Sequence, residues 1–232
     1  MMNTMNLTQI TKNLKINEEK LSEMLAACGI DASNGTVTIG EAMALKQYAK
    51  EHENTPAQKA QNYLEKSAEC CTIFVDTNQL LCDQFPDFLE RVTPLLKKNG
   101  KKLLIPSGVL CEMQNLLFRE DELAEKVSSV MELLERKEQE GVVAMVGNEG
   151  VTFADQQMLT IATCAMLSDT LMFLTKDNGL SEDILKVNDL NSVQGNKVFV
   201  NRINRYGYLS RYITAAEREA AAQGVSQLPP AC

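Results

Sequence analysis

Four carboxylic acids stand beside segments that have the composition of buried strands, and together they could bind a metal ion. Asp76 ends the apolar run TIFVD, and Asp177 comes shortly after TLMFLT. Glu112 lies in the helix expected after KKLLIP, and Asp155 opens the helix expected after VVAMV. The carboxyl ends of parallel strands form the edge at which open α/β sheets bind ligands, so we expect the four acids to lie there together.

Asp76 is the most difficult of these acids to explain by structure alone. A buried carboxylate without a partner is unfavourable, so a core strand that ends on one needs a cation, N–H donors or a metal ion nearby. The other three acids have ordinary alternatives. Asp155 could complement a helix dipole, Asp177 could belong to a turn, and Glu112 could be a solvated helix residue.

Taken together, the four acids favour a cation site. Two carboxylates about 5 Å apart repel by roughly 3 kcal/mol at an effective dielectric constant near 20, so a crevice that holds four of them either retains protons or binds cations. Mg²⁺ and Mn²⁺ match an all-oxygen site, and such a site suits the hydrolysis of a phosphodiester. We therefore expect Mg²⁺ or Mn²⁺ as the cofactor.

Composition narrows the class of protein. The formal net charge of −8 over 232 residues argues against a protein that coats nucleic acid through a basic surface. One histidine, His52, argues against histidine-based catalysis, and seven cysteines without C-x-x-C spacing are typical of reduced thiols in a cytoplasm. The chain has no signal-peptide pattern and no apolar segment of membrane-spanning length, so we expect a cytoplasmic protein without a membrane partner.

The chain is expected to contain two folded parts. Residues 1–54 carry three amphipathic segments and form a small helical domain. Residues 55–69 are a linker that passes into a short helix. Strands and helices alternate over residues 70–212, and residues 213–232 form a C-terminal tail.

Five apolar segments separated by helical patterns predict an α/β fold with a parallel sheet covered on both faces. The expected strands are TIFVD, KKLLIP, VVAMV, TLMFLT and NKVFV.

Four segments of this region resemble the motifs of PIN-domain nucleases and occur in the same order. They are FVDTNQLL, IPSGVLCEMQNL, FADQQMLTIATCAML and FLTKDNGLSEDI. The resemblance covers about residues 70–202 and implies a PIN-like, Rossmann-like nuclease domain. It also implies a catalytic, metal-binding quartet made of Asp76, Glu112, Asp155 and Asp177.

The same resemblance implies supporting roles for three polar residues. Thr77 and Asn78 correspond to the small polar residue and the Asn that follow the first acid, and Thr175 corresponds to the hydroxyl residue before the last acid. The family implies an endonuclease that cleaves RNA, usually single-stranded, by attack of a metal-bound water and leaves a 5′-phosphate. DNA is not excluded as a substrate. The chain is longer than the small toxins that are common in this family.

The N-terminal segment LTQITKNLKINEEKLSEMLAACGID is similar to the small helical domain at the N-terminus of bacterial translation initiation factor two. By that similarity, the N-terminal domain could bind nucleic acid or a protein partner such as an inhibitor, or it could serve only as a packing cap.

The segment VNRINRYGYLSRY interleaves basic and aromatic residues and contains no acid. This pattern suits phosphate contacts and base stacking. We predict that the nucleic-acid-binding residues are Arg202, Arg205, Tyr206, Tyr208 and Arg211. The alternative is that the tyrosines dock on the domain while the arginines stay solvated.

Other chemistries lack their sequence signatures. The chain has no G-x-G-x-x-G motif and no P-loop. A haloacid-dehalogenase-type phosphatase would need an aspartate where Asn78 stands. A receiver domain could use Lys176, but it would leave Glu112 and Asp155 unexplained. We therefore predict a metal-dependent endoribonuclease; the alternative is a non-catalytic PIN-like module that binds RNA or protein, which the presence of all four acids disfavours.

Overall fold

The computed structural model of the chain describes residues 4–14, 16, 18–51, 55–119, 121–147, 153–190 and 195–222. The chain divides into two compact units, Met1–Lys59 and Ala60–Cys232, and the division falls within helix α4 (Pro56–Cys70). Each unit has its own cluster of buried apolar side chains. His52 lies outside the described residues. In the described ranges no helix combines the length and apolarity needed to cross a membrane.

The first unit has three helices in the segments where the sequence predicts them, and it adds two short strands. Its elements are β1 (Thr4–Asn6), α1 (Leu7–Leu14), α2 (Glu18–Cys28), β2 (Thr36–Thr38) and α3 (Ile39–Glu51). The two strands pair antiparallel. Strands of three residues are too short to show a pattern of alternating apolar and polar residues in the sequence. Thr38 and Glu41 form a capping box at the start of α3, with N–H to side-chain distances of 2.7 and 3.3 Å.

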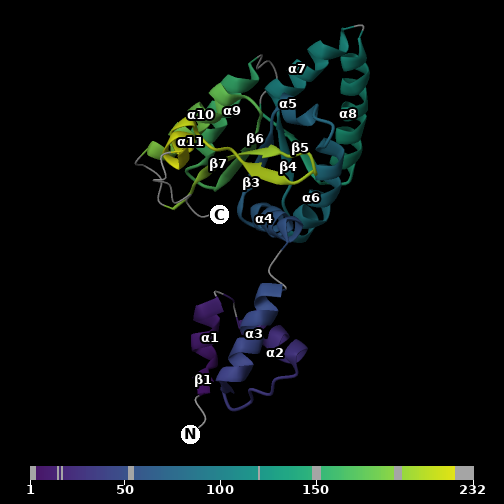
Figure 1. Cartoon of the computed structure of the whole chain (residues 1–232). Helices are drawn as coiled ribbons and strands as arrows, with labels where there is room; N and C mark the ends of the chain where they lie inside the picture. The colour runs from purple at the N-terminus through teal and green to yellow at the C-terminus, as the bar shows by residue number, and fades with distance from the viewer. Residues whose placement is uncertain are drawn as a thin grey trace. The chain divides into compact units, whose positions relative to one another are not determined.

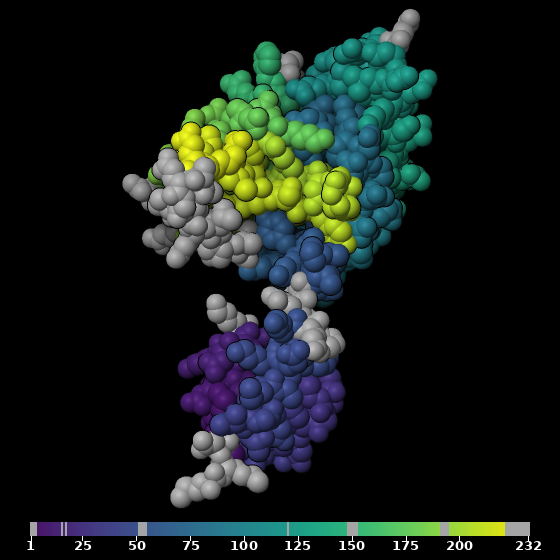
Figure 2. All heavy atoms as spheres, in the orientation of Figure 1, coloured from purple at the N-terminus to yellow at the C-terminus, as the bar shows by residue number. Residues whose placement is uncertain are grey.

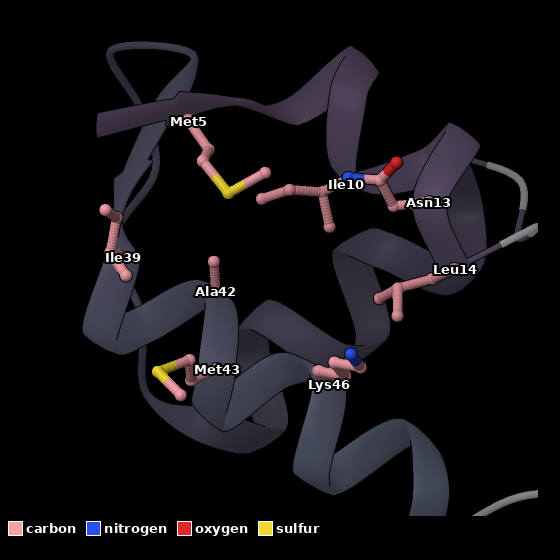
Figure 3. Close-up of a pocket in the computed structure, with 8 residues that line it drawn as sticks. All are labelled: Met5, Ile10, Asn13, Leu14, Ile39, Ala42, Met43 and Lys46. Carbon is pink, nitrogen blue, oxygen red and sulfur yellow. The ribbon is translucent and has the colours of Figure 1, made fainter. Parts of the chain in front are cut away.

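A groove of about 430 Å³ lies on the first unit, where side chains of β1, α1 and α3 face one another (Figure 3). Its lining is mostly apolar, and two of its residues, Ile39 and Met43, are exposed.

The second unit is an α/β fold built on a six-stranded sheet, as expected for the class (Figure 1). The strands are β3 (Thr72–Val75), β4 (Leu103–Pro106), β5 (Val143–Val146), β6 (Leu171–Leu174), β7 (Val198–Ile203) and β8 (Leu209–Arg211). Their spatial order is β5-β4-β3-β6-β7-β8. The first five strands are parallel, which confirms the predicted parallel sheet, whereas β8 pairs antiparallel with β7 and was not predicted.

From β3 the chain first adds strands on one side of the sheet, and from β6 onward it adds them on the other side. Within the sheet the third, second and first strands of the unit are followed by the fourth, fifth and sixth, which is the doubly wound arrangement. In register, Val75 lies opposite Leu174, so the residues that follow these two strands emerge side by side. Such a switch point is where open α/β sheets form their ligand crevice.

Helices lie on both sides of the sheet (Figure 1), and all four residues of β6 are buried. The helices are α4, α5 (Thr77–Leu80), α6 (Phe85–Asn99), α7 (Ser107–Leu117), α8 (Glu122–Gln139), α9 (Ala154–Ala165), α10 (Asn178–Lys186) and α11 (Ala215–Ala222), with a short 3₁₀ turn at Val187–Asp189. Phe74 and Phe173 stack across β3 and β6 at a ring-centroid distance of 5.1 Å in the centre of the core. Helix α6 ends at Gly100, whose φ of 63° is a left-handed conformation that glycine adopts without strain.

Helix α11 begins two residues into the segment predicted as a tail. Thr214 and Glu217 form a second capping box, with distances of 2.9 and 3.1 Å. The rest of the predicted tail, residues 223–232, lies outside the described residues.

We expect a chain that begins at Thr55 to fold as an independent α/β unit. Thr55 caps α4 through its Oγ1, which accepts the Gln58 N–H over 3.2 Å, and Leu64 and Ala68 of the same helix belong to the core of the second unit. Thermal unfolding followed by circular dichroism should therefore be cooperative. A shorter chain that begins at Ala60 lacks the cap and should be less stable by about 1 kcal/mol. A broad, non-cooperative transition for both chains would mean that the two units share one core.

Candidate active site

The carboxylate of Asp76 is buried at the carboxyl end of β3, with only 4% of the residue exposed. It caps helix α5, because its Oδ1 accepts the Thr77 N–H over 2.7 Å. Its Oδ2 accepts the Thr175 hydroxyl over 2.6 Å and the side-chain N–H of Asn78. The acid is therefore held by one backbone donor and two side-chain donors, which offsets much of the desolvation of a buried carboxylate.

Asn78 and Thr175 connect the ends of β3 and β6. Asn78 Nδ2 also donates to Thr175 Oγ1 over 3.2 Å, and its Oδ1 accepts the Lys176 N–H over 2.7 Å. Thr175 Oγ1 in turn accepts the Asp177 N–H over 3.0 Å. These two polar residues, with Asp76, form one network across the switch point.

The other three acids reach the same edge from three helices. Glu112, from α7, accepts the Thr77 hydroxyl at Oε2 over 2.5 Å. Asp155 is exposed in the first turn of α9. Asp177 caps α10 by accepting the Leu180 N–H over 2.8 Å, so the turn role considered for it from sequence is also present.

Charge interactions link the acids in pairs: Asp76 with Glu112, Asp76 with Asp155, and Asp155 with Asp177. Burial raises the pKa of Asp76 to about 6, the Thr175 hydroxyl and the Thr77 N–H act against this rise, and the charges of Glu112 and Asp155 add to it. The pKa of Asp155 is also raised, first by partial burial and then by the charge of Asp177. Without a cation, Asp76 therefore keeps its proton to a higher pH than an isolated aspartate does.

The donor set suits Mg²⁺ or Mn²⁺ in its chemistry, since it consists of carboxylate oxygens. Within the described ranges, however, no three Asp, Glu, His or Cys side chains gather closely enough to form a complete metal-binding group. Mg²⁺ usually retains several waters and takes one or two carboxylates directly. Asp76 Oδ1 accepts one hydrogen bond from the described residues and can accept another ligand. The residues therefore fit a hydrated ion better than one enclosed by protein.

Gln157 positions the helices that carry Glu112 and Asp155, a role that the sequence analysis misses. Its Oε1 accepts the Gly108 N–H over 2.7 Å, and its Nε2 donates to Ser107 Oγ over 2.8 Å, which ties α9 to the start of α7. A Cβ at Gly108 would lie 2.9 Å from Ala154 Cα, so this close approach requires glycine. A lone glutamine in an amphipathic helix carries no sequence signal for such a contact.

Figure 2 shows the end of the described chain as a yellow band on one face of the second unit. The predicted basic and aromatic residues of this region separate into two groups. Arg205 and Tyr206 are exposed at the turn between β7 and β8, with the guanidinium 4.7 Å from the ring centroid. Tyr208 stacks at 4.5 Å with Arg91 of α6. The tyrosine therefore docks on the domain, as in the alternative considered from sequence.

Arg202 and Arg211 lie apart from that turn. The Arg202 guanidinium is 4.9 Å from the Tyr212 ring centroid, and Arg211 forms an ion pair with Glu217 over 2.5 Å.

No model of a known protein family matches the chain, and no curated protein matches it either.

We expect Asp76→Asn to abolish a loss of stability that the metal-free wild type undergoes as the pH rises towards about 6. The Asp76 carboxyl has a pKa of 3.8 when unfolded and about 6 when folded, so the folded state binds this proton more tightly. The stability that the folded protein gains from binding this proton is complete below pH 3.8 and is lost as the pH rises through about 6. Relative to the variant, the wild-type free energy of unfolding should fall by up to about 3 kcal/mol over this range.

Urea unfolding of both proteins in EDTA across this pH range measures the difference. A variant that is less stable at every pH would show that Asp76 acts mainly as a structural acceptor.

We expect Gln157→Met to lower the free energy of unfolding by about 1–3 kcal/mol, because the buried Gly108 N–H would lose its acceptor. Gln156→Met is the matched control, since Gln156 is exposed on the same helix and should change stability by less than about 0.5 kcal/mol. Equal stabilities for the two variants in urea unfolding would contradict the positioning role.

Proposed function

We propose that the second unit is a metal-dependent endonuclease of the PIN-domain type that cleaves single-stranded RNA. The observation that carries the proposal is the buried Asp76 carboxylate at the switch point, electrostatically coupled to Glu112 and Asp155 at the same edge. The ordered resemblance of four segments to PIN-domain motifs supports the proposal, because the four acids stand in those segments.

The roles of the residues follow from their contacts. Thr175, Asn78 and the start of α5 donate hydrogen bonds to the Asp76 carboxylate. These contacts hold its Oδ1 in one orientation. Asp155 and Asp177 are exposed, so a nucleic-acid strand can reach them from solvent. When bound, Mg²⁺ or Mn²⁺ would lower the pKa of a water and offset negative charge on the phosphate.

A second candidate is a PIN-like module that binds RNA or protein without cleaving. The absence of three closely gathered ligands among the described residues favours it. The presence of four acids at one edge favours catalysis, since binding alone does not require their mutual repulsion. An activity measurement separates the two.

We expect the purified protein to cleave single-stranded RNA with Mn²⁺ or Mg²⁺ and not with EDTA. Asp76→Asn, Asp155→Asn, Asp177→Asn and Glu112→Gln should each lower the rate by at least about 100-fold, since each removes part of the charge that would hold the ion. Single-stranded DNA of the same sequence tests the choice of nucleic acid.

Asp169→Asn is the matched control for these variants. Asp169 is an exposed aspartate just before β6, at the opposite edge of the sheet, and its replacement should leave cleavage unchanged. Cleavage that persists in all four acid variants would assign the activity to a contaminant, and a complete lack of cleavage with either ion would favour the binding module.

A further inference from the structure

Three arginines line a pocket of about 260 Å³ beside the acidic edge. We call it the arginine pocket, and its described lining is Asn178, Arg202, Ser210, Arg211, Tyr212, Ile213 and Arg218. None of these residues is acidic, although the chain as a whole has a formal net charge of −8. A cationic pocket on an acidic protein attracts anions to that one part of the surface.

Arg202 joins the arginine pocket to the acidic edge. Its Nη2 donates to Asn178 Oδ1 over 2.6 Å and to the Lys176 carbonyl over 3.3 Å, on the two sides of Asp177. Stacking on Tyr212 further restrains the guanidinium. Its Nε is buried and has no hydrogen-bond partner among the described residues.

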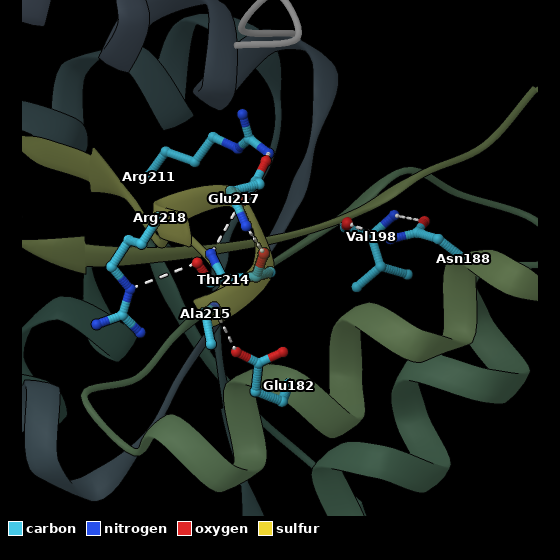
Figure 4. Close-up of polar contacts among 8 residues, drawn as sticks. All are labelled: Glu182, Asn188, Val198, Arg211, Thr214, Ala215, Glu217 and Arg218. Atoms are coloured by element: carbon cyan, nitrogen blue, oxygen red, sulfur yellow. Dashed lines mark hydrogen bonds and ion pairs between the residues drawn. The ribbon is translucent and has the colours of Figure 1, made fainter. Parts of the chain in front are cut away.

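Arg211 is partly neutralised by Glu217, which has a second task. Glu217 Oε1 accepts from Arg211, while Oε2 accepts the Thr214 N–H in the capping box of α11 (Figure 4). Glu182 is also engaged, since its Oε1 accepts the Tyr212 hydroxyl and the Ala215 N–H. Both carboxylates therefore serve structural contacts around the pocket.

Arg218 has the least engaged guanidinium of the three. Its Nε donates to the Thr214 carbonyl over 3.4 Å, and Figure 4 shows its terminal nitrogens directed away from the Arg211–Glu217 pair. The residue is exposed on α11. Its forked donors can therefore reach a ligand without breaking a strong contact.

We infer that the arginine pocket binds a phosphate group of a nucleic-acid strand. Three guanidinium groups against the Glu217 and Glu182 carboxylates leave one net positive charge, which suits a backbone phosphate or a terminal phosphate monoester. Ser210 and the exposed Ile213 complete the lining. That the phosphate belongs to RNA rests on the proposed function, but phosphate binding itself does not require cleavage.

Binding is measured on the full chain in EDTA, which separates it from cleavage. The probes are inorganic phosphate and short, fluorescently labelled single-stranded RNA with a 5′-phosphate, a 3′-phosphate or neither. Arg218→Gln should weaken binding of the RNA probe by about tenfold. Glu217→Gln should strengthen it, because Gln retains the capping box and removes the opposing charge. The strengthening excludes misfolding as the cause, since a misfolded pocket would not bind more tightly.

Arg136→Gln is the matched control, because Arg136 is an exposed arginine of α8 outside the pocket. An effect of Arg218→Gln confined to one phosphorylated probe identifies a terminal phosphate, and an equal effect on all RNA probes identifies a backbone phosphate; both support the inference. Wild-type affinities for Arg218→Gln and Glu217→Gln with every probe would overturn it. Phosphate binding without cleavage would contradict the proposed nuclease and leave the pocket supported.

Discussion

Burial of the Asp76 carboxylate at the end of β3 is the constraint on which the polar edge of the sheet depends. A charge in this position is tolerated only with donors around it, and the donors come from both sides of the switch point. Thr175 reaches it from the end of β6, and Asn78 binds the two segments together. The equal register of β3 and β6 makes these contacts possible, because it brings the residues after the two strands to the same level.

The same arrangement leaves a residual electrostatic strain. The donors act against the rise in the pKa of Asp76, yet burial and the neighbouring acids exceed them, so the ionised state is less favourable in the folded protein than in the unfolded chain. A purely structural cap would not need Glu112 and Asp155 beside it. Natural proteins retain such strain where function depends on it, which is the physical basis for treating this edge as a site.

The two signs of charge lie close together at this edge. Asp177 and Asn178 are adjacent in sequence, and Arg202 holds the backbone and side chain on either side of Asp177. A strand with a phosphate in the arginine pocket would have its neighbouring phosphates near the acids. The basic side supplies attraction for a polyanion, and the acidic side would need a cation before a phosphate could approach.

Composition and pattern determined the α/β class, because five apolar strands separated by amphipathic helices have few ways to bury both faces. They also singled out Asp76, since a carboxylate at the end of a core strand is unfavourable wherever that strand lies. Three-residue strands such as β8 were missed, because a strand of that length owes its existence to its neighbour rather than to its own sequence. Only the tertiary structure decided which distant side chains meet: Gln157 with Gly108, Arg202 with Asn178, and Arg218 with the arginine pocket. Such contacts depend on strand order and helix placement, which the local pattern of a single chain does not encode.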